Sequence, residues 1–262
     1  MSKTKHIGQC IYCRALPTPE DPLSDEHIIP LGLYGTQMLG KASCKSCAAI
    51  TSDFEGKVQQ HDMGDLRHSL NFPSRRKNKR KNIKLPMEVI TRGGEVKNIE
   101  VSPEDYYPII ALPVFRPPAY ISKEKYDGGI EMIGYVTVPP KRSLEKIVGE
   151  LDAKEVAIYS LRWPKAWARM FAKIAYALAV REYGLDRLNR EDIYVLSSIL
   201  GKTNDVGMWV GCVEEQVFSG DQYKEQLAGL WLKDGEIHVV IKLFSWLNIV
   251  PEYHVVVGKL SS

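Results

Sequence analysis

Two pairs of cysteines near the start of the chain constrain its fold more than any other feature. Two residues separate Cys10 from Cys13 and Cys44 from Cys47, and about thirty residues lie between the pairs. This spacing lets both thiolates of a pair reach one ion, and two such pairs complete a closed tetrahedral shell. The pattern therefore predicts a structural zinc site held by all four cysteines, rather than four unrelated thiols or a redox-active pair.

The composition is that of an ordinary globular protein, with 262 residues, 44% of them hydrophobic, and a formal net charge of +3. That charge is too small to imply a nucleic-acid partner by itself. No run of about 18 apolar residues occurs, and no apolar stretch precedes Cys10, so we expect no membrane segment, no signal peptide and a cytoplasmic location. Thiols stay reduced there, which favours metal binding by the paired cysteines. The fifth, Cys212, is expected to be a buried small hydrophobe.

The chain divides into two parts by composition, as its length favours, because domains of about 100–150 residues are the most common. Residues 1–70 are loop-rich and contain few large apolar side chains, so a metal would help to hold them together. Residues 71–84 form a basic connector without an acidic residue. Residues 85–262 contain strand-like and helical segments. We therefore predict an α+β fold in which a zinc-stapled module precedes a mixed α+β domain with a β-rich end.

Helical periodicity is strongest over residues 164–183, where Pro164 suits the first turn and Gly184 the stop. A stripe of Trp167, Phe171, Ile174 and Leu178 predicts one buried face. A second helix is expected over 190–200. Strands are expected over 87–91, 207–213, 227–232, 237–244 and 254–257, with a hairpin turn at residues 234–235.

An acidic pair stands beside a histidine between the two cysteine pairs, at Asp25, Glu26 and His27. A histidine can take a proton from water, while a neighbouring carboxylate holds a divalent ion that neutralises charge developing on a phosphate. A lone Glu-His pair is more often a surface turn than a site. Its position between two zinc knuckles makes this one a candidate for catalysis.

The order of these motifs resembles the zinc-containing branch of the HNH (ββα-metal) endonuclease superfamily. The matching pieces are Cys10-x-x-Cys13, Glu26-His27-Ile-Ile-Pro30 and Cys44-x-x-Cys47, followed by a helix-compatible run over residues 48–60. The resemblance covers residues 8–70 and implies a β-hairpin and a helix around one Mg²⁺ or Mn²⁺ ion. It implies that His27 is the general base and that Glu26, where the family usually has Asp, is a metal ligand. Asp25 would replace or support Glu26.

The main departure from the family pattern follows the second cysteine pair. The family has an asparagine there that helps to hold the metal or orient the histidine, whereas this chain has Ala48. We favour the explanation that the chain is an inactivated Asn→Ala variant, because the rest of the motif is intact. The other explanation is a ligand borrowed from the same helix face, where Ser52 and Glu55 follow at four and seven residues.

A dense basic segment follows the proposed catalytic helix. It contains Arg75, Arg76, Lys77, Lys79, Arg80 and Lys81, and Arg67 lies shortly before it. Charge runs are usually solvated surface. Beside a nuclease motif, this one predicts contacts to backbone phosphates, which give affinity without sequence specificity.

Together these patterns predict a nuclease domain over 1–70, a connector over 71–84 and an α+β domain over 85–262. The predicted activity is metal-dependent hydrolysis of nucleic-acid phosphodiesters, with DNA favoured and, by resemblance alone, a restriction or anti-phage role. A non-catalytic nucleic-acid-binding module and a protein-interaction adaptor are the alternatives. The sequence does not decide whether the protein forms a homodimer. Residues 85–262 could serve in DNA recognition, in dimerisation, or in binding of a regulatory ligand or partner protein.

Overall fold

The computed structural model describes residues 4–69, 71–73, 83–103, 106, 110–138, 149, 153–156, 163–213, 215–218, 226–247 and 249–261. It is a mixed α+β protein with several small sheets, as the sequence predicts. Among the described helices, none combines the length and the apolar character that crossing a membrane would require.

The N-terminal part is a small sheet followed directly by a helix. Its strands are β1 (Thr4–His6), β2 (Ser24–His27) and β3 (Met38–Ser43), in the order β1-β3-β2, with β2 antiparallel to β3. The connection between β2 and β3 contains the short helix η1 (Leu31–Leu33), and after β3 come α1 (Lys45–Gly56), the π-helical turn η2 (Lys57–Asp62) and α2 (Gly64–Ser69). The predicted helical run over 48–60 therefore begins earlier and changes its hydrogen bonding after Gly56.

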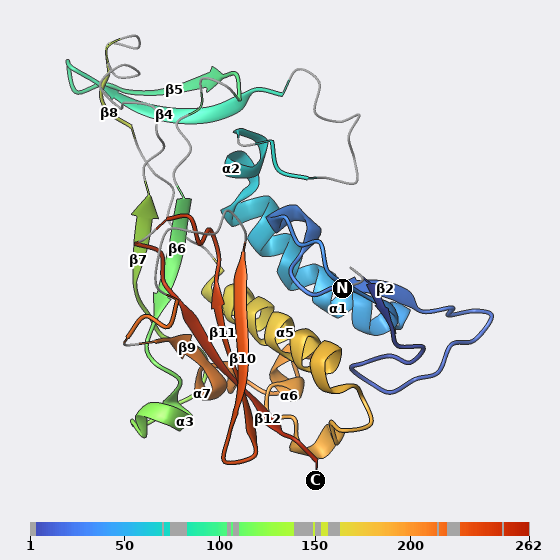
Figure 1. The fold of residues 1–262 in the computed structure, drawn as a ribbon. Helices are drawn as coiled ribbons and strands as arrows, with labels where there is room; N and C mark the ends of the chain where they lie inside the picture. Colours follow the sequence, from blue (N-terminus) through green and yellow to red (C-terminus); the bar gives the residue numbers. More distant parts are fainter. Residues whose placement is uncertain are drawn as a thin grey trace.

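Helix α5 (Pro164–Tyr183) lies at the centre of the molecule, with the predicted bounds and with Gly184 as its C-cap. Figure 1 shows α5 between the N-terminal part on one side and a four-stranded sheet on the other. Residues 170–177 are all buried, so α5 is enclosed on nearly all sides and not along one stripe.

The four-stranded sheet is antiparallel and has the order β10-β11-β12-β9. Its strands are β9 (Val210–Cys212), β10 (Leu227–Lys233), β11 (Glu236–Lys242) and β12 (Tyr253–Lys259). The turn between β10 and β11 has positive φ at Asp234 (53°) and Gly235 (78°), which confirms the predicted hairpin.

Two smaller sheets and several short helices complete the fold. The strands are β4 (Leu85–Thr91), β5 (Val96–Val101) and β8 (Ala153–Val156) in the order β5-β4-β8, and the pair β6 (Ile110–Phe115) and β7 (Met132–Val138). The short helices are α3 (Ala119–Ser122), η4 (Arg190–Asp192), α6 (Leu196–Ile199) and α7 (Val206–Trp209). In Figure 1 the β5-β4-β8 sheet lies at the top, away from α5.

The prediction of one helix over 190–200 was wrong, because η4 and α6 are separate. Strand β12 prevents a continuous helix: a side chain at Gly258 would overlap the carbonyl oxygen of Asp192, and Val195 N–H donates to Val257 O. The predicted strand over 207–213 was also wrong at its start, since α7 occupies Val206–Trp209. There, Gly207 N–H bonds to Gly129 O at 2.8 Å, outside any sheet.

One hydrophobic core runs from the N-terminal sheet through α5 to the four-stranded sheet. Polar contacts also join α5 to the N-terminal part. One is the hydrogen bond that the Tyr176 hydroxyl donates to Ile11 O at 2.5 Å. The N-terminal part therefore buries its apolar side chains against α5 as well as around its cysteines. The division at residues 71–84 stays a prediction, because residues 74–82 lie outside the described part of the chain.

Candidate metal centre and adjoining cavity

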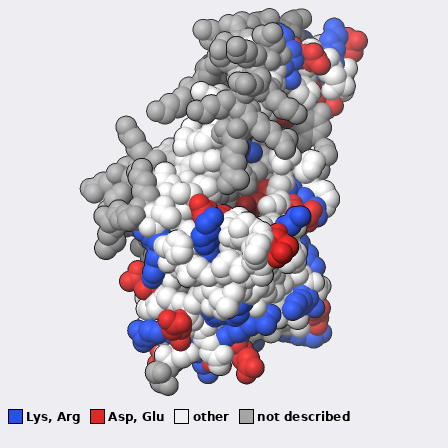
Figure 2. All heavy atoms as spheres, turned by 90° about the vertical axis from the view of Figure 1, so that its right-hand side faces the viewer, with Lys and Arg blue, Asp and Glu red and all other residues white. Residues whose placement is uncertain are grey.

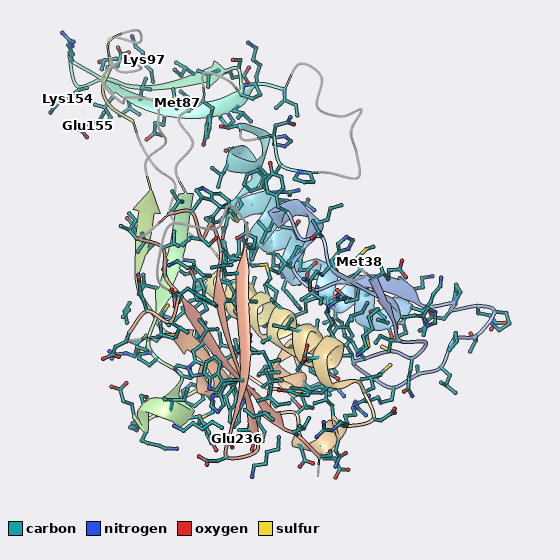
Figure 3. The ribbon with its side chains drawn as sticks, in the orientation of Figure 1. Met38, Met87, Lys97, Lys154, Glu155 and Glu236 are labelled. Carbon is teal, nitrogen blue, oxygen red and sulfur yellow. The ribbon has the colours of Figure 1, made fainter. Side chains whose placement is uncertain are left out.

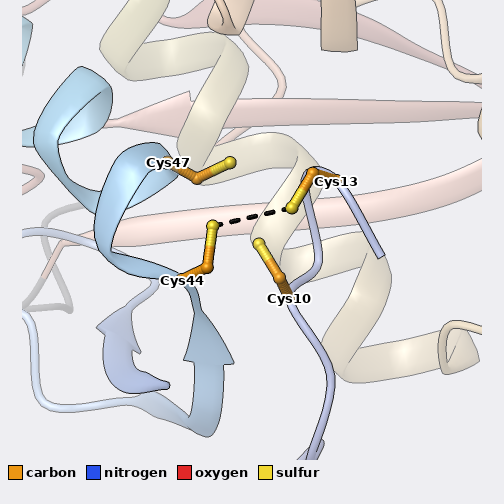
Figure 4. A group of neighbouring side chains, drawn as sticks. All are labelled: Cys10, Cys13, Cys44 and Cys47. Atoms are coloured by element: carbon orange, nitrogen blue, oxygen red, sulfur yellow. Dashed lines mark hydrogen bonds between the residues drawn. The ribbon is translucent and has the colours of Figure 1, made fainter. Parts of the chain in front are cut away.

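The four N-terminal cysteines meet at the junction of a turn and a helix (Figure 4). Cys10 and Cys13 lie in a turn closed by Arg14 N–H, which donates to Cys10 O at 2.9 Å. Cys44 is the N-cap of α1, and Cys47 lies in the first turn of that helix. The helix start is fixed further by Asp21, whose carboxylate accepts the N–H of Lys45 at 2.9 Å.

The geometry of the cysteine cluster fits one zinc ion. The four sulfur atoms all lie within 4.8 Å of one another, and the Cys13 and Cys44 sulfurs are 3.5 Å apart. A tetrahedral ion with Zn–S bonds of about 2.3 Å would place its sulfurs about 3.8 Å apart. The predicted ligand set is therefore assembled by the fold and can bind a metal such as zinc.

The ionisation of the thiols follows from their burial and their mutual contacts. Burial raises the pKa of Cys10 and of Cys47. Burial also acts to raise the pKa of Cys44, but hydrogen bonds from Ser46 and the neighbouring cysteines outweigh it and lower the pKa to about 7. Without metal, one thiol of the group thus ionises first, and a bound cation would displace protons from the others.

A cavity of about 790 Å³ lies beside this centre, between β2 and α1. Its walls include Asp25, Glu26 and His27 from β2 and Ala48, Ser52 and Glu55 from α1. The residues from α1 are four and three positions apart and share one helix face. The fold therefore brings the predicted acidic residues, the predicted base and Ala48 together around one cavity.

The hairpin register positions His27 at this cavity. His27 pairs with Met38, and Glu26 pairs with Leu39, after a bulge that follows Ser24. Figure 3 labels Met38, the β3 residue that pairs with His27. Asp25 also lines the cavity, and one of its carboxylate oxygens accepts the N–H of Lys41 at 3.0 Å. This bond ties Asp25 to β3.

A buried lysine from α5 contacts both glutamates of the cavity. The Lys173 ammonium lies 2.7 Å from Glu26 Oε1 and 2.9 Å from Glu55 Oε1, and its side chain is fully buried. It also donates to the backbone carbonyls of His27 and Ile28. Burial acts to lower the pKa of Lys173, but the charges of the two glutamates and the hydrogen bonds to them raise it overall. The lysine is thus held as a cation.

Sequence reasoning missed Lys173, although it left a signal. A lysine between Ala172 and Ile174 interrupts an otherwise apolar run. A charged residue inside a buried helix needs a partner, and lysine is almost never fully buried without one. The partners themselves lie about 120–150 residues earlier in the chain, so no local pattern identifies them.

The predicted phosphate-contacting residues fall into two groups. Arg67 lines the cavity, and its guanidinium donates to the backbone carbonyls of Gly32, Gln59 and Pro73. Arg75, Arg76, Lys77, Lys79, Arg80 and Lys81 lie outside the described residues. Figure 2 shows lysines and arginines interspersed with acidic residues on the described part of the face that is on the right in Figure 1. Phosphate contact therefore stays a prediction.

The fifth cysteine is accounted for by packing. Cys212 is 7% exposed, and its sulfur accepts the N–H of Phe115 at 3.3 Å. Burial raises its pKa to about 11. It belongs to the hydrophobic core, as predicted.

Comparison with family models, with curated proteins and with solved structures found no match to this chain.

Proposed function

We propose that this chain is a metal-dependent endonuclease of the HNH type, which hydrolyses nucleic-acid phosphodiesters, with DNA as the favoured substrate. The observation that carries the proposal is the single cavity lined by Glu26, His27 and the Ala48 face of α1, next to a four-cysteine cluster. A strand pair followed by a helix frames this cavity, as the resemblance implies.

Each residue of the cavity has a separate role in the proposed reaction. His27 would accept the proton of the attacking water, and Glu26 would hold Mg²⁺ or Mn²⁺ together with Asp25 or Glu55. When bound, the ion supplies positive charge beside the phosphate and the leaving oxygen. Glu55 offers the oxygen that Ala48 lacks, which supports the explanation that a natural chain borrows its ligand from the same helix face. Under the other explanation, Ala48 replaces a natural asparagine.

The predicted basic segment would serve the same reaction. Residues 75–81 follow α2 in the chain, and α2 contributes Arg67 and His68 to the cavity wall. Lysines and arginines there would neutralise backbone phosphates on either side of the cut. This supports a substrate that is a polymer and not a single nucleotide.

A second candidate function is a non-catalytic, zinc-stapled module that binds nucleic acid. Two observations favour it. Glu26 is only 8% exposed and is ion-paired to Lys173, so one of its oxygens is already engaged. Ala48 offers no oxygen to the cavity. Under this function the basic segment binds phosphates and no bond is cut.

Cleavage assays separate the two functions. Supercoiled plasmid, single-stranded DNA and RNA are each incubated with Mg²⁺ or Mn²⁺ and with this chain, Ala48→Asn, Ala48→Asn/His27→Ala, or Ala48→Asn/Glu26→Gln. The exposed His6 provides the control, as Ala48→Asn/His6→Ala. We expect cleavage by Ala48→Asn that is retained in the His6 variant and falls at least about 100-fold without His27, as removing a general base does.

The outcome without cleavage is equally informative. If neither this chain nor Ala48→Asn cuts any substrate while both bind it in a salt-dependent manner, the binding module is correct. If neither cuts nor binds, the adaptor alternative replaces both. Cleavage by the unmodified chain that is lost in Glu55→Gln would identify Glu55 as the replacement ligand and Ala48 as natural.

A further inference from the structure

We infer that Lys173 is a positioning residue of the proposed nuclease site, through which α5 holds Glu26, Glu55 and the backbone at His27 in their working arrangement. The inference rests on the proposed function, and it adds a residue that lies far outside the HNH-like segment. Residues from both the N-terminal part and α5 would then form the site.

The first observation is the number of oxygens around the ammonium. Its nitrogen lies 2.7 Å from Glu26 Oε1, 2.9 Å from Glu55 Oε1 and 3.4 Å from Ile28 O, and it also donates to His27 O. These four oxygens come from β2, the residue after it and α1. One cation therefore joins the strand that carries the proposed base to the helix that forms the opposite wall.

The second observation is the charge balance. Within this cluster, two carboxylates and one ammonium leave one net negative charge, with the ammonium fully buried and the carboxylates 8% and 17% exposed. Without the ammonium, two carboxylates that both contact this one nitrogen atom would repel each other in a medium that screens their charges poorly. This repulsion would move β2 away from α1 and so alter the proposed ligand set.

The third observation links the lysine to the base. His27 lines the cavity, and its carbonyl oxygen accepts a hydrogen bond from Lys173. A hydrogen bond at its main chain restricts motion of this peptide unit, and so holds in place the Cα that carries the imidazole. A displacement of about 1 Å at a reacting group can cost about 100-fold in rate. Lys173 would thus act on catalysis through His27 and Glu26 without touching the substrate.

The test is chemical rescue of Lys173→Ala in the full, zinc-loaded chain, in whichever background the cleavage assays show to be active. We expect the rate of cleavage to fall about 100-fold and to recover about tenfold with millimolar propylammonium. Propanol, which has a similar shape but no charge, should give no recovery. Equal effects of propylammonium and propanol, or an unchanged rate in Lys173→Ala, would overturn the inference.

A second pair of variants covers the case in which Lys173→Ala does not fold. Lys173→Met/Glu55→Gln removes one positive and one negative charge, so its net charge at the cavity equals that of the original site. Glu55→Gln alone is the reference. Amide hydrogen exchange over residues 24–29 is measured in both, and we expect at least tenfold faster exchange in the double variant, while exchange in β10 and β11 stays the same.

This readout separates failure of the inference from failure of the proposed function. If no form of the protein cleaves nucleic acid but exchange over 24–29 rises as expected, Lys173 positions the strand and the nuclease proposal is wrong. If the protein cleaves and exchange over 24–29 is equal in the two variants, the positioning role of Lys173 is wrong and the nuclease proposal stands.

Discussion

Cys44 lies between the end of β3 and the start of α1, so one residue serves as a helix N-cap and as a proposed zinc ligand. We expect Cys44→Ser to lose the bound zinc and to be less stable by about 3 kcal/mol or more, since a structural metal contributes its binding energy to folding. Metal content by mass spectrometry and thermal unfolding measure the two effects. The control is Cys212→Ser, which should keep its zinc. Equal metal content in both variants would contradict the four-cysteine site.

His254 on β12 gives the protein a predictable response to acid. Burial, followed by the nearby charges of His238 and Lys233, lowers the pKa of His254 from 6.5 to about 4. Between these values the unfolded chain binds a proton that the folded chain does not, so stability should fall as the pH drops from 6.5 towards 4. The loss amounts to about 3 kcal/mol at most, because lowering a pKa by one costs about 1.4 kcal/mol.

Chemical denaturation between pH 4 and 7 measures this dependence. His254→Gln should flatten the pH dependence over this range, whereas the same change at the exposed His6 should leave it as it is. A slope that persists in His254→Gln would assign the acid sensitivity to other groups. His238 would then be the first group to test by substitution, because its Nδ1 lies 3.0 Å from His254 Nε2 and a hydrogen bond links the two rings.

Among the elements of the fold, the connection between β2 and β3 depends on close backbone packing. A side-chain carbon at Gly35 would overlap the carbonyl oxygen of Ile29, two residues after His27. We expect Gly35→Ala to destabilise the protein by about 2 kcal/mol or more, because the backbone on both sides must shift.

The matched control for Gly35 is Gly64→Ala in the first turn of α2. A side-chain carbon there would have no heavy atom within 4 Å, so we expect a change within about 0.5 kcal/mol. Denaturant midpoints compare the two. Equal stability of the two variants would contradict the close backbone packing between Gly35 and Ile29. It would also contradict the described shape of the cavity wall that this connection forms.

Across the molecule as a whole, the shared core predicts cooperative unfolding. The N-terminal part and the four-stranded sheet pack on opposite sides of α5, and the buried hydrogen bond from Tyr176 to Ile11 O joins α5 to the N-terminal part. We expect one thermal transition, with release of zinc at the same temperature as loss of near-ultraviolet circular dichroism. Zinc release in a separate, earlier transition would show that residues 1–70 unfold on their own, as the predicted domain division implies.

Features whose causes lie in neighbouring residues could be predicted from the amino-acid sequence. The cysteine spacing predicted the four-sulfur cluster that could bind a metal, the Pro164–Gly184 signals predicted α5 with its observed bounds, and Asp-Gly predicted the β10–β11 turn. The catalytic roles that the resemblance implies for Glu26 and His27 stay predictions. The α5 bounds and the turn depend on residues a few positions apart or on a repeating pattern, and each cysteine pair is likewise a local motif.

Features whose causes are distant in the chain emerged only when the elements packed together. Close approach of β12 at Gly258 broke the expected helix over 190–200, and the bond from Gly207 to Gly129 replaced the start of an expected strand with α7. The contacts of Lys173 at the candidate site also arise from packing. This lysine lies in an apolar run of α5, and it meets Glu26 and Glu55 only because α5 packs against β2 and α1. Burial of its charge requires partners, and the fold supplies them from the N-terminal part of the chain.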